Sequence, residues 1–346
     1  MVSSRPFGAH YAQLKDRAVT RLPSIGITMG DPAGIGAEII CRSLAELRPK
    51  QRGRFIVFGD RALMDRANTL VRTELSFNDM PERNADRPTV IDIQPKVPGT
   101  VQDGKMSAAA GARSYAYIER AVSAALAGDV GVIVTAPINK EALHAAGYPF
   151  EGHTELLAHL TNTRSSFMLL ASEKLSVIHV STHVSLAGAV TRATAERELA
   201  TIRMGHAHLK RMGITNPRIA VAGLNPHSGE NGLFGRDEIE RIQPAIDTAR
   251  QEGINVIGPV PGDTVFYRAV RGEFDLVVAQ YHDQGHIPAK LIAFDTTVNV
   301  TLGLSILRVS VDHGTAFDIA WKGVARHDNM NTTIDYAGRL AAAEHA

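Results

Sequence analysis

The chain has 346 residues, of which 44% are hydrophobic and 21% are charged, and its 37 basic side chains nearly balance 36 acidic ones. This composition excludes a largely disordered chain. The net charge of +1 argues against a protein whose main partners are nucleic-acid phosphates or an anionic membrane surface. The length predicts two domains or one large α/β domain.

The single cysteine, Cys41, can form no internal disulfide and excludes a site built on paired cysteines. Residues 1–10 contain no apolar core of a signal peptide. No apolar run approaches the roughly 18 residues that a membrane-spanning helix needs. We therefore expect a cytoplasmic protein.

Apolar, β-branched runs alternate with helical patterns along the chain. The predicted strands span residues 24–29, 54–58, 89–93, 130–135, 167–171, 176–181, 218–223, 255–258, 276–279, 298–301 and 306–310. The predicted helices include residues 37–47, 108–126, 194–212, 237–251 and 315–321. Strands separated by helices of this length predict parallel sheets with right-handed crossovers.

A glycine-rich segment, GDPAGIG at residues 30–36, joins the first predicted strand to the first predicted helix. Glycines allow a tight turn, and the free amides of a helix start favour anions. The spacing matches neither the dinucleotide-binding fingerprint nor the P-loop. A tight turn and a ligand loop therefore both remain interpretations.

Three histidines each follow a predicted apolar strand: His183 in STH, His227 in NPHSGE and His282 in YHDQG. The carboxyl ends of parallel strands gather ligands, so these side chains can converge on one metal ion and leave positions open for substrate. No signature of the HExxH kind fixes their geometry, and three unrelated surface histidines are the alternative.

Other polar residues interrupt apolar surroundings. In the tetrapeptide GHTE, Thr154 can cap a helix, or it can form an anion site with His153. Lys290, Asn299 and Arg308 lie in apolar segments, where a bound carboxylate or phosphate, or an internal salt bridge, explains them.

The last motif, DHGTAFDIAWKG at residues 312–323, contains a Gly-Thr turn that can bind a nucleotide or merely cap a short helix. The candidate cofactor-binding residues in it are His313, Gly314, Thr315 and Asp318.

Taken together, these segments form a recognisable series between residues 27 and 320: ITMGDPAGIGAEI, TAPINKEAL, GHTELL, STH, NPHSGENGLFG, PGDT, YHDQGHIPAK, VNVTLG and VDHGTAFDIA. The series resembles the 4-hydroxythreonine-4-phosphate dehydrogenase family of vitamin B6 biosynthesis. GDPAGIG and HGTAFDIA are also similar to the isocitrate and isopropylmalate dehydrogenase group. The resemblance implies two α/β/α domains with a cleft between them, which we expect at residues 1–135 plus 285–346 and at residues 136–284.

The resemblance also implies roles for individual residues. It implies a divalent cation (Zn, Mg, Co or Mn) on His183, His227 and His282. It implies contacts to a small phosphorylated substrate from His153, Thr154, Lys290, Asn299 and Arg308, with Asp263 and Lys290 as candidate catalytic groups. It further implies NAD or NADP as cofactor and a homodimer whose active site lies near the interface.

The implied reaction is oxidation of the secondary alcohol of 4-hydroxythreonine 4-phosphate, followed by decarboxylation, on the route to pyridoxal phosphate. ENGLFG and AFDIAW resemble a second branch that acts on 4-phosphothreonate or 4-phosphoerythronate in sugar-acid catabolism. A third branch oxidises aromatic cis-dihydrodiols but departs from GHTE, which this chain keeps. A non-catalytic protein that binds phosphorylated metabolites is the least favoured alternative.

Overall fold

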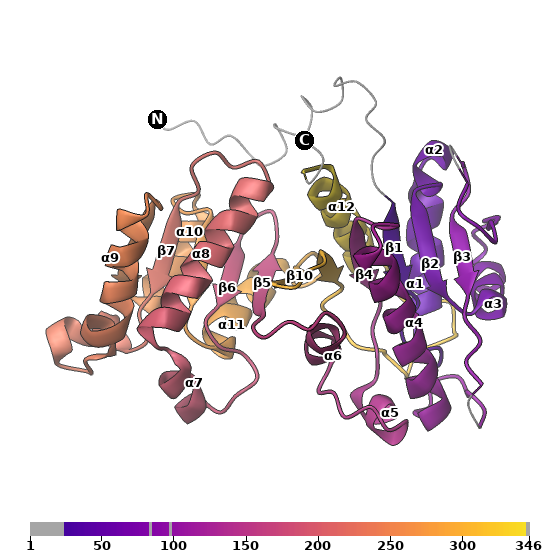
Figure 1. The fold of residues 1–346 in the computed structure, drawn as a ribbon, viewed down its shortest axis with the longest axis horizontal. Helices are drawn as coiled ribbons and strands as arrows, with labels where there is room; N and C mark the ends of the chain where they lie inside the picture. The colour runs from indigo at the N-terminus through magenta and orange to yellow at the C-terminus, as the bar shows by residue number, and fades with distance from the viewer. Residues whose placement is uncertain (1–23, 83–84, 97–98, 344–346) are drawn as a thin grey trace. The chain divides into compact units, whose positions relative to one another are not determined.

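The structure is a computed structural model that describes residues 24–82, 85–96 and 99–343 (Figure 1). The chain divides into two compact units. The middle unit is Phe167–Thr297, and the terminal unit combines the described residues before 167 with those after 297. The two-unit α/β architecture is the one that the sequence predicts.

The unit boundaries lie later in the chain than the expected positions after residues 135 and 284. The first boundary is later because α5 (Lys140–Ala145) and α6 (His153–Leu160) pack against α4 (Ala108–Leu126) of the terminal unit. The second is later because α11 (His282–Ala293) packs on β6 (Ser176–His179) and β9 (Leu276–Ala279) of the middle unit. Residues 1–23 and 344–346 of the expected first domain lie outside the described residues.

The sheet of the terminal unit has the strand order β3-β2-β1-β4-β11-β10. All neighbours are parallel except β10 and β11. Its strands are β1 (Ile25–Thr28), β2 (Phe55–Gly59), β3 (Thr89–Asp92), β4 (Val132–Thr135), β10 (Val298–Leu302) and β11 (Arg308–Ser310). Strands β1, β2 and β4 are buried along their whole length because helices cover both faces of this sheet.

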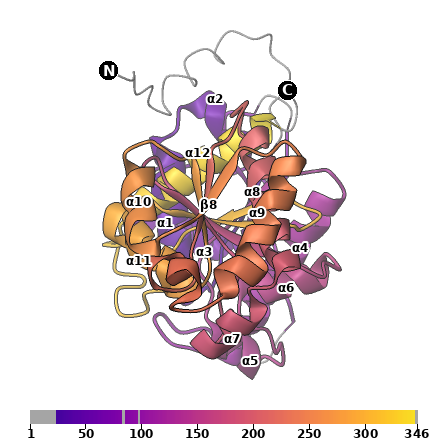
Figure 2. The ribbon, with the colours of Figure 1, turned by 90° about the vertical axis from the view of Figure 1, so that its left-hand side faces the viewer.

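On one face of this sheet, α1 packs against α3 and α12, and on the other α4 contacts β1, β2 and β4 (Figure 2). The bounds are α1 (Gly36–Glu46), α2 (Pro49–Arg52), α3 (Arg61–Val71) and α12 (Asp328–Ala343).

The sheet of the middle unit has the order β5-β6-β9-β7-β8, with only β5 and β6 antiparallel. Its strands are β5 (Phe167–Ala171), β6 (Ser176–His179), β7 (Ile219–Ala222), β8 (Val256–Val260) and β9 (Leu276–Ala279). Helices α8 (Ala195–Arg211) and α9 (Gln243–Gln251) cover one face, and α10 (Gly262–Val270) and α11 cover the other (Figure 2). The short α7 (Leu186–Arg192) precedes α8.

Every predicted strand is present, with small shifts at its ends. The predicted helix 237–251 begins as a π-helical turn, η4 (Glu238–Ile242), before it continues as α9. None of the described helices is long and apolar enough to cross a membrane.

The predicted helix at 315–321 is wrong, because residues 317–321 form turns and residues 315 and 316 are irregular. Ala316 and Trp321 have left-handed φ values of 46° and 60°, which a right-handed helix does not allow. The buried carboxylate of Glu38 accepts the main-chain N–H of Trp321 and of Gly323, both at 2.7 Å. A long-range acceptor thus takes the N–H of Trp321, which a helix at 315–321 would have bonded to the Phe317 carbonyl.

Candidate functional site

The three candidate metal-binding histidines all belong to the middle unit and follow neighbouring parallel strands. His183 comes after β6, His227 after β7 and His282 directly after β9. Strand β9 pairs with both β6 and β7, so the three loops leave the same edge of the sheet. His183 and His227 are exposed and His282 is half-buried, so all three are accessible to a ligand.

Two of these imidazoles lie close together: the ring centroids of His183 and His282 are 6.0 Å apart. Two imidazoles on one tetrahedral cation would have centroids about 5 Å apart, so this pair fits a shared metal after a small adjustment. The Nδ1–H of His282 donates to the Asp283 carboxylate at 2.7 Å, the kind of carboxylate contact that orients a ligating imidazole. Among the described residues, no three His, Cys, Asp or Glu side chains already form a metal-binding group. Convergence of all three histidines on one cation stays a prediction.

Side chains that the sequence analysis missed connect the three loops. The Ser181 hydroxyl donates to the Gln280 carbonyl at 3.0 Å, which joins the loop of His183 to that of His282. The Gln280 amide donates to the Ala222 carbonyl at 2.9 Å, and the Gln284 amide to the Gly223 carbonyl at 2.7 Å. These last two bonds join the loop of His282 to that of His227. The two glutamines flanking YHD were the available signal, because buried amides at strand ends need partners.

Two further histidines, His286 and His179, pack behind one another next to His282. The His286 ring stacks on the His282 ring with centroids 3.7 Å apart and an interplanar angle of 11°. His286 Nδ1 lies 3.1 Å from His179 Nε2, and His179 Nδ1 lies 3.2 Å from the Met168 carbonyl. Burial, followed by the effect of neighbouring histidines, lowers the pKa of His179 to about 3 and that of His286 to about 4. Both rings are therefore neutral at physiological pH.

The two candidate catalytic residues also lie in the middle unit. Asp263 is exposed in the first turn of α10, and Lys290 is half-buried in the last turn of α11, with Nζ 5.6 Å from the Phe294 ring centroid. The charge of Lys290 contributes to the lowered pKa of His286, so the cation is near the histidine group. Neither role is tested by these positions, and both stay predictions.

In the terminal unit, Arg308 is a cation surrounded by hydroxyls. It is 3% exposed, and its guanidinium donates to Thr135 Oγ1 at 3.2 and 2.6 Å and to Thr301 Oγ1 at 2.8 Å. Burial lowers the pKa of Arg308 to about 9, partly offset by the Glu155 carboxylate, so the group still carries its charge at neutral pH. An internal salt bridge was one of the two explanations that the sequence offers for Arg308. These three hydrogen bonds go to neutral hydroxyls and do not form such a salt bridge.

His153 is close enough to Arg308 for their charges to interact. Burial first and the Arg308 charge second hold the pKa of His153 well below its ordinary value. Its Nε2 atom is buried and has no hydrogen-bond partner among the described residues. The Oδ1 atom of Asn299, which shares a sheet face with Arg308, is buried and unpartnered in the same way. The Arg308 cation and a donor from His153 can bind an anion, whereas the Asn299 oxygen only accepts and would pair with a hydroxyl or ammonium group of the same ligand.

The capping interpretation of Thr154 is wrong. The residue that caps α6 is Gly152, and His153 and Thr154 are the first two residues of the helix. Their main-chain amides therefore belong to the unsatisfied N–H groups of a helix start, which favour anions.

The candidate cofactor segment offers one clear unsatisfied atom. His313 Nδ1 lies 3.1 Å from the Gly314 carbonyl, which can only accept, so Nδ1 carries a hydrogen. The Nε2 atom of His313 is buried and unpartnered among the described residues, which leaves it available to a polar group of a ligand. Thr315 accepts the Ile35 N–H through its carbonyl at 3.2 Å, and Asp318 is exposed.

The GDPAGIG segment is a closely packed turn. Gly30 has φ of +77°, and a Cβ on it would lie 2.4 Å from the Pro137 carbonyl oxygen. Asp31 Oδ1 accepts the Ala33 N–H at 2.8 Å, and burial raises the pKa of Asp31 to about 6. These contacts support the structural interpretation of the turn.

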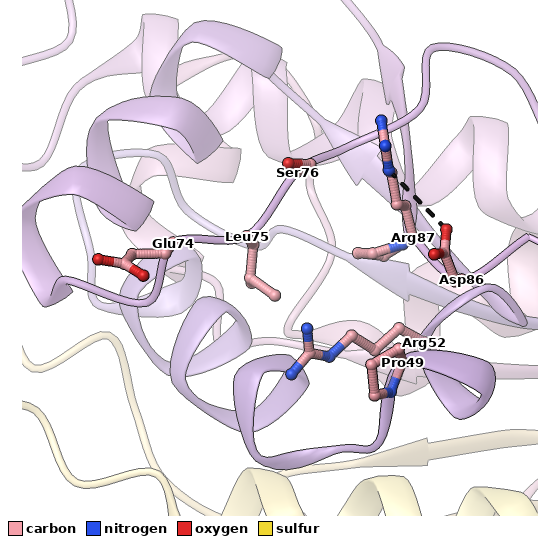
Figure 3. A pocket seen from close by; sticks show the side chains of 8 residues that line it. Pro49, Arg52, Glu74, Leu75, Ser76, Asp86 and Arg87 are labelled. Carbon is pink, nitrogen blue, oxygen red and sulfur yellow. Dashed lines mark ion pairs between the residues drawn. The ribbon is translucent and has the colours of Figure 1, made fainter.

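Figure 3 shows a polar pocket of about 190 Å³ in the terminal unit that contains none of the candidate residues. Its Arg52 is already bonded to the carbonyls of Ala45 and Leu47, and Asp86 and Arg87 form an exposed ion pair at 3.8 Å. We assign it no role in the reaction. The lining residues are Pro49, Arg52, Glu74, Leu75, Ser76, Asp86, Arg87 and Pro88.

The chain is similar along most of its length to proteins of one known family. Residues 51–337 match the family described as pyridoxal phosphate biosynthetic protein PdxA. The chain is 48% identical to a D-threonate 4-phosphate dehydrogenase of Pectobacterium atrosepticum, over 92% of this chain and 99% of that protein. It is 45% identical to a 4-hydroxythreonine-4-phosphate dehydrogenase of Beijerinckia indica, over 91% of this chain and 94% of that one.

Among solved structures, the crystal structure of 4-hydroxythreonine-4-phosphate dehydrogenase from Klebsiella pneumoniae is similar. It superposes with a TM-score of 0.83 at 46% identity, covering 94% of this chain and 99% of that one.

Proposed function

The chain belongs to the family of the pyridoxal phosphate biosynthetic protein PdxA and is a dehydrogenase, and on this premise we propose its substrate class, cofactors and assembly. The substrate is a phosphorylated four-carbon 3-hydroxy acid. Its secondary alcohol is oxidised with NAD or NADP, and the resulting β-keto acid loses carbon dioxide.

The proximity of His183 and His282, on loops joined to that of His227, is the observation that carries the proposal. We assign cation binding to these three histidines. A divalent cation held there supplies Lewis acidity toward oxygen atoms of the substrate. Neutral imidazoles suit Zn or Co better than Mg or Mn.

Phosphate binding is assigned to the terminal-unit residues His153, Thr154, Asn299 and Arg308. The buried guanidinium of Arg308, bonded only to hydroxyls in the contacts described above, can donate charge-assisted bonds to phosphate oxygens. The start of α6 adds main-chain amides. Lys290 in the middle unit is assigned to the substrate as well.

The oxidation removes a hydride from the alcohol carbon and a proton from its oxygen. His313, Gly314, Thr315 and Asp318 would hold the nicotinamide cofactor, which would supply the hydride acceptor when bound. Asp263 or Lys290 takes the proton. When the carboxylate leaves as carbon dioxide, the electron pair of the broken C–C bond stays on the remaining carbon, which then takes up a proton.

Two substrates satisfy this class. The family description favours 4-hydroxythreonine 4-phosphate and hence pyridoxine biosynthesis. The name of the 48% identical relative favours D-threonate 4-phosphate, which belongs to the second branch that the sequence resembles. The two differ in an amino or a hydroxyl group at C2.

We also propose a homodimer in which one subunit helps to complete the site of its partner. Ile287 and Leu291 on α11 and Phe294 directly after it form an apolar stripe, and they are 56%, 82% and 68% exposed. The same helix begins with His282, so a partner that covers the stripe would lie close to a candidate ligand.

The direct test is reduction of NAD or NADP by the purified protein with each phosphorylated substrate, before and after chelation. We expect one substrate to be strongly preferred, activity to be lost on chelation and to return with a divalent cation. His183→Ala, His227→Ala and His282→Ala should each abolish turnover and keep the circular dichroism spectrum of the wild type. Full activity in the triple variant after chelation would overturn the metal assignment, and absence of activity with both substrates would overturn the substrate class.

A further inference from the structure

The segment that presents His227 has an unusual backbone. Residues 227–231 all have left-handed φ values, between 43° and 78°. Only one of them, Gly229, is a glycine, and non-glycine residues rarely adopt this conformation. A run of this kind persists only where its surroundings hold it in place.

The side chain of Glu238 provides such a constraint. Its carboxylate is 2% exposed, and Oε1 accepts the main-chain N–H groups of Leu224 and Asn225 at 2.8 and 2.7 Å. Oε2 accepts the Asn225 side-chain amide at 3.0 Å. Three donors therefore hold one buried carboxylate directly before the left-handed run.

The same carboxylate also touches the run itself. A Cβ added to Gly229 would lie 2.7 Å from Glu238 Oε2, so the backbone of residue 229 lies directly against that oxygen. Glu238 is in turn the first residue of η4, a π-helical turn, and π-helical turns are frequent at functional sites. The carboxylate thus contacts both Leu224 and Asn225, which precede the left-handed run, and Gly229 at its centre.

We propose that Glu238 is a positioning residue, whose carboxylate holds the left-handed turn so that His227 faces a bound cation. This inference rests on the proposed function, because it takes His227 as a metal ligand. Glu238 itself acts only through the turn. A carboxylate suits this task because both of its oxygens accept, whereas all three groups bonded to it donate.

Asp237 offers a matched control. It is the adjacent acidic residue and also accepts the Asn225 amide at 3.0 Å, but it makes none of the main-chain contacts. We compare Glu238→Ala with Asp237→Ala, and add Glu238→Gln, which keeps the side-chain volume if the alanine variant fails to fold. One readout needs no metal: amide hydrogen exchange at Leu224 and Asn225 in the apo-protein. The others are Zn²⁺ affinity by calorimetry and the visible spectrum of the Co²⁺-loaded protein, which reports the ligand geometry.

The Glu238 variants should exchange these two amides at least tenfold faster, bind Zn²⁺ about 10–100-fold more weakly and show an altered Co²⁺ spectrum, while Asp237→Ala resembles the wild type. Equal effects in Asp237→Ala would overturn the proposal. So would wild-type exchange and Zn²⁺ affinity in the Glu238 variants, provided that His227→Ala binds Zn²⁺ weakly. Undiminished Zn²⁺ affinity in His227→Ala would instead overturn the metal assignment of the proposed function, and the positioning role with it.

Discussion

His286 Nδ1 and His179 Nε2 are 3.1 Å apart, and the acceptors around them fix which nitrogens carry hydrogen. His179 Nδ1 faces the Met168 carbonyl and His286 Nδ1 faces the His282 carbonyl at 3.0 Å. A carbonyl can only accept, so each Nδ1 must be the protonated nitrogen of a neutral ring. His179 Nε2 then accepts from His286, and His286 Nε2 keeps a lone pair.

This arrangement predicts the tautomers of both rings. In the apo-protein at neutral pH, ¹⁵N nuclear magnetic resonance should show protonated Nδ1 and unprotonated Nε2 for His179 and for His286. In His179→Phe, His286 should keep this tautomer because its Nδ1 still faces the His282 carbonyl. Its ring should be less well ordered against the His282 ring, because the hydrogen bond to His179 is lost. A protonated Nε2 on His286 in the wild type would contradict the hydrogen-bond assignment.

Removal of the buried Arg308 guanidinium should narrow the preference for phosphorylated substrates. The wild type should use unphosphorylated 4-hydroxythreonine or threonate very poorly. Charge-assisted bonds contribute roughly 1.5–3 kcal/mol each, so Arg308→Ala should lower kcat/KM for the phosphorylated compound by two or more powers of ten. The unphosphorylated compound should be nearly unaffected. Arg120→Ala, an exposed arginine of α4 in the same unit, is the control. An equal loss for both compounds would reassign Arg308 to the substrate carboxylate.

The glycine-rich turn predicts a difference between two glycines of the terminal unit. Gly30 and Gly128 both have left-handed φ values, +77° and +81°, but a Cβ on Gly30 would lie 2.4 Å from the Pro137 oxygen, whereas Gly128 has nothing within 4 Å. Gly128→Ala should cost about 1 kcal/mol of stability through its backbone conformation alone. Gly30→Ala should cost several times more, because the backbone must also move. Urea unfolding of the two variants measures this difference, and similar midpoints would show that the turn relaxes freely.

Glu198 predicts a pH dependence of stability. It is fully buried, and burial raises its pKa from 4.5 to about 8, partly offset by the hydrogen bond from Gln280. The folded protein therefore holds a proton that the unfolded chain releases. This stabilisation is fully present below the unfolded pKa and is lost as the pH rises through the folded pKa.

Glu198→Gln mimics the protonated side chain and lacks this titration. The urea midpoint of the variant minus that of the wild type should therefore increase as the pH is raised from about 5 to about 8. A constant difference across that range would mean that Glu198 is ionised in the folded state.

The apolar stripe on α11 predicts the assembly. Leu291→Glu places a charge in the centre of the stripe and should convert the dimer to a monomer in sedimentation experiments, because obligate interfaces exclude unpaired charge. Leu126→Glu, at an exposed leucine of the terminal unit, should leave the mass unchanged. A monomeric wild type with full activity would refute the proposed homodimer.

The sequence by itself determined the strands, because an apolar β-branched run is a local signal that needs no distant partner. It also determined that His183, His227 and His282 follow strands, and the family to which their motifs belong. It could not locate the unit boundaries, since these depend on which unit α5, α6 and α11 pack against.

Tertiary structure alone decided the features that depend on distant partners. Glu38 accepts the N–H groups of Trp321 and Gly323, 283 and 285 residues away in sequence, where the sequence predicts a helix over 315–321. Arg308 is bonded to Thr135, which is 173 residues away in sequence. Glu238 holds the left-handed turn of His227 by accepting the N–H groups of Leu224 and Asn225, which precede the turn. In each case a buried polar group had to find a partner, and the identity of that partner is set by how the chain packs rather than by its neighbours in sequence.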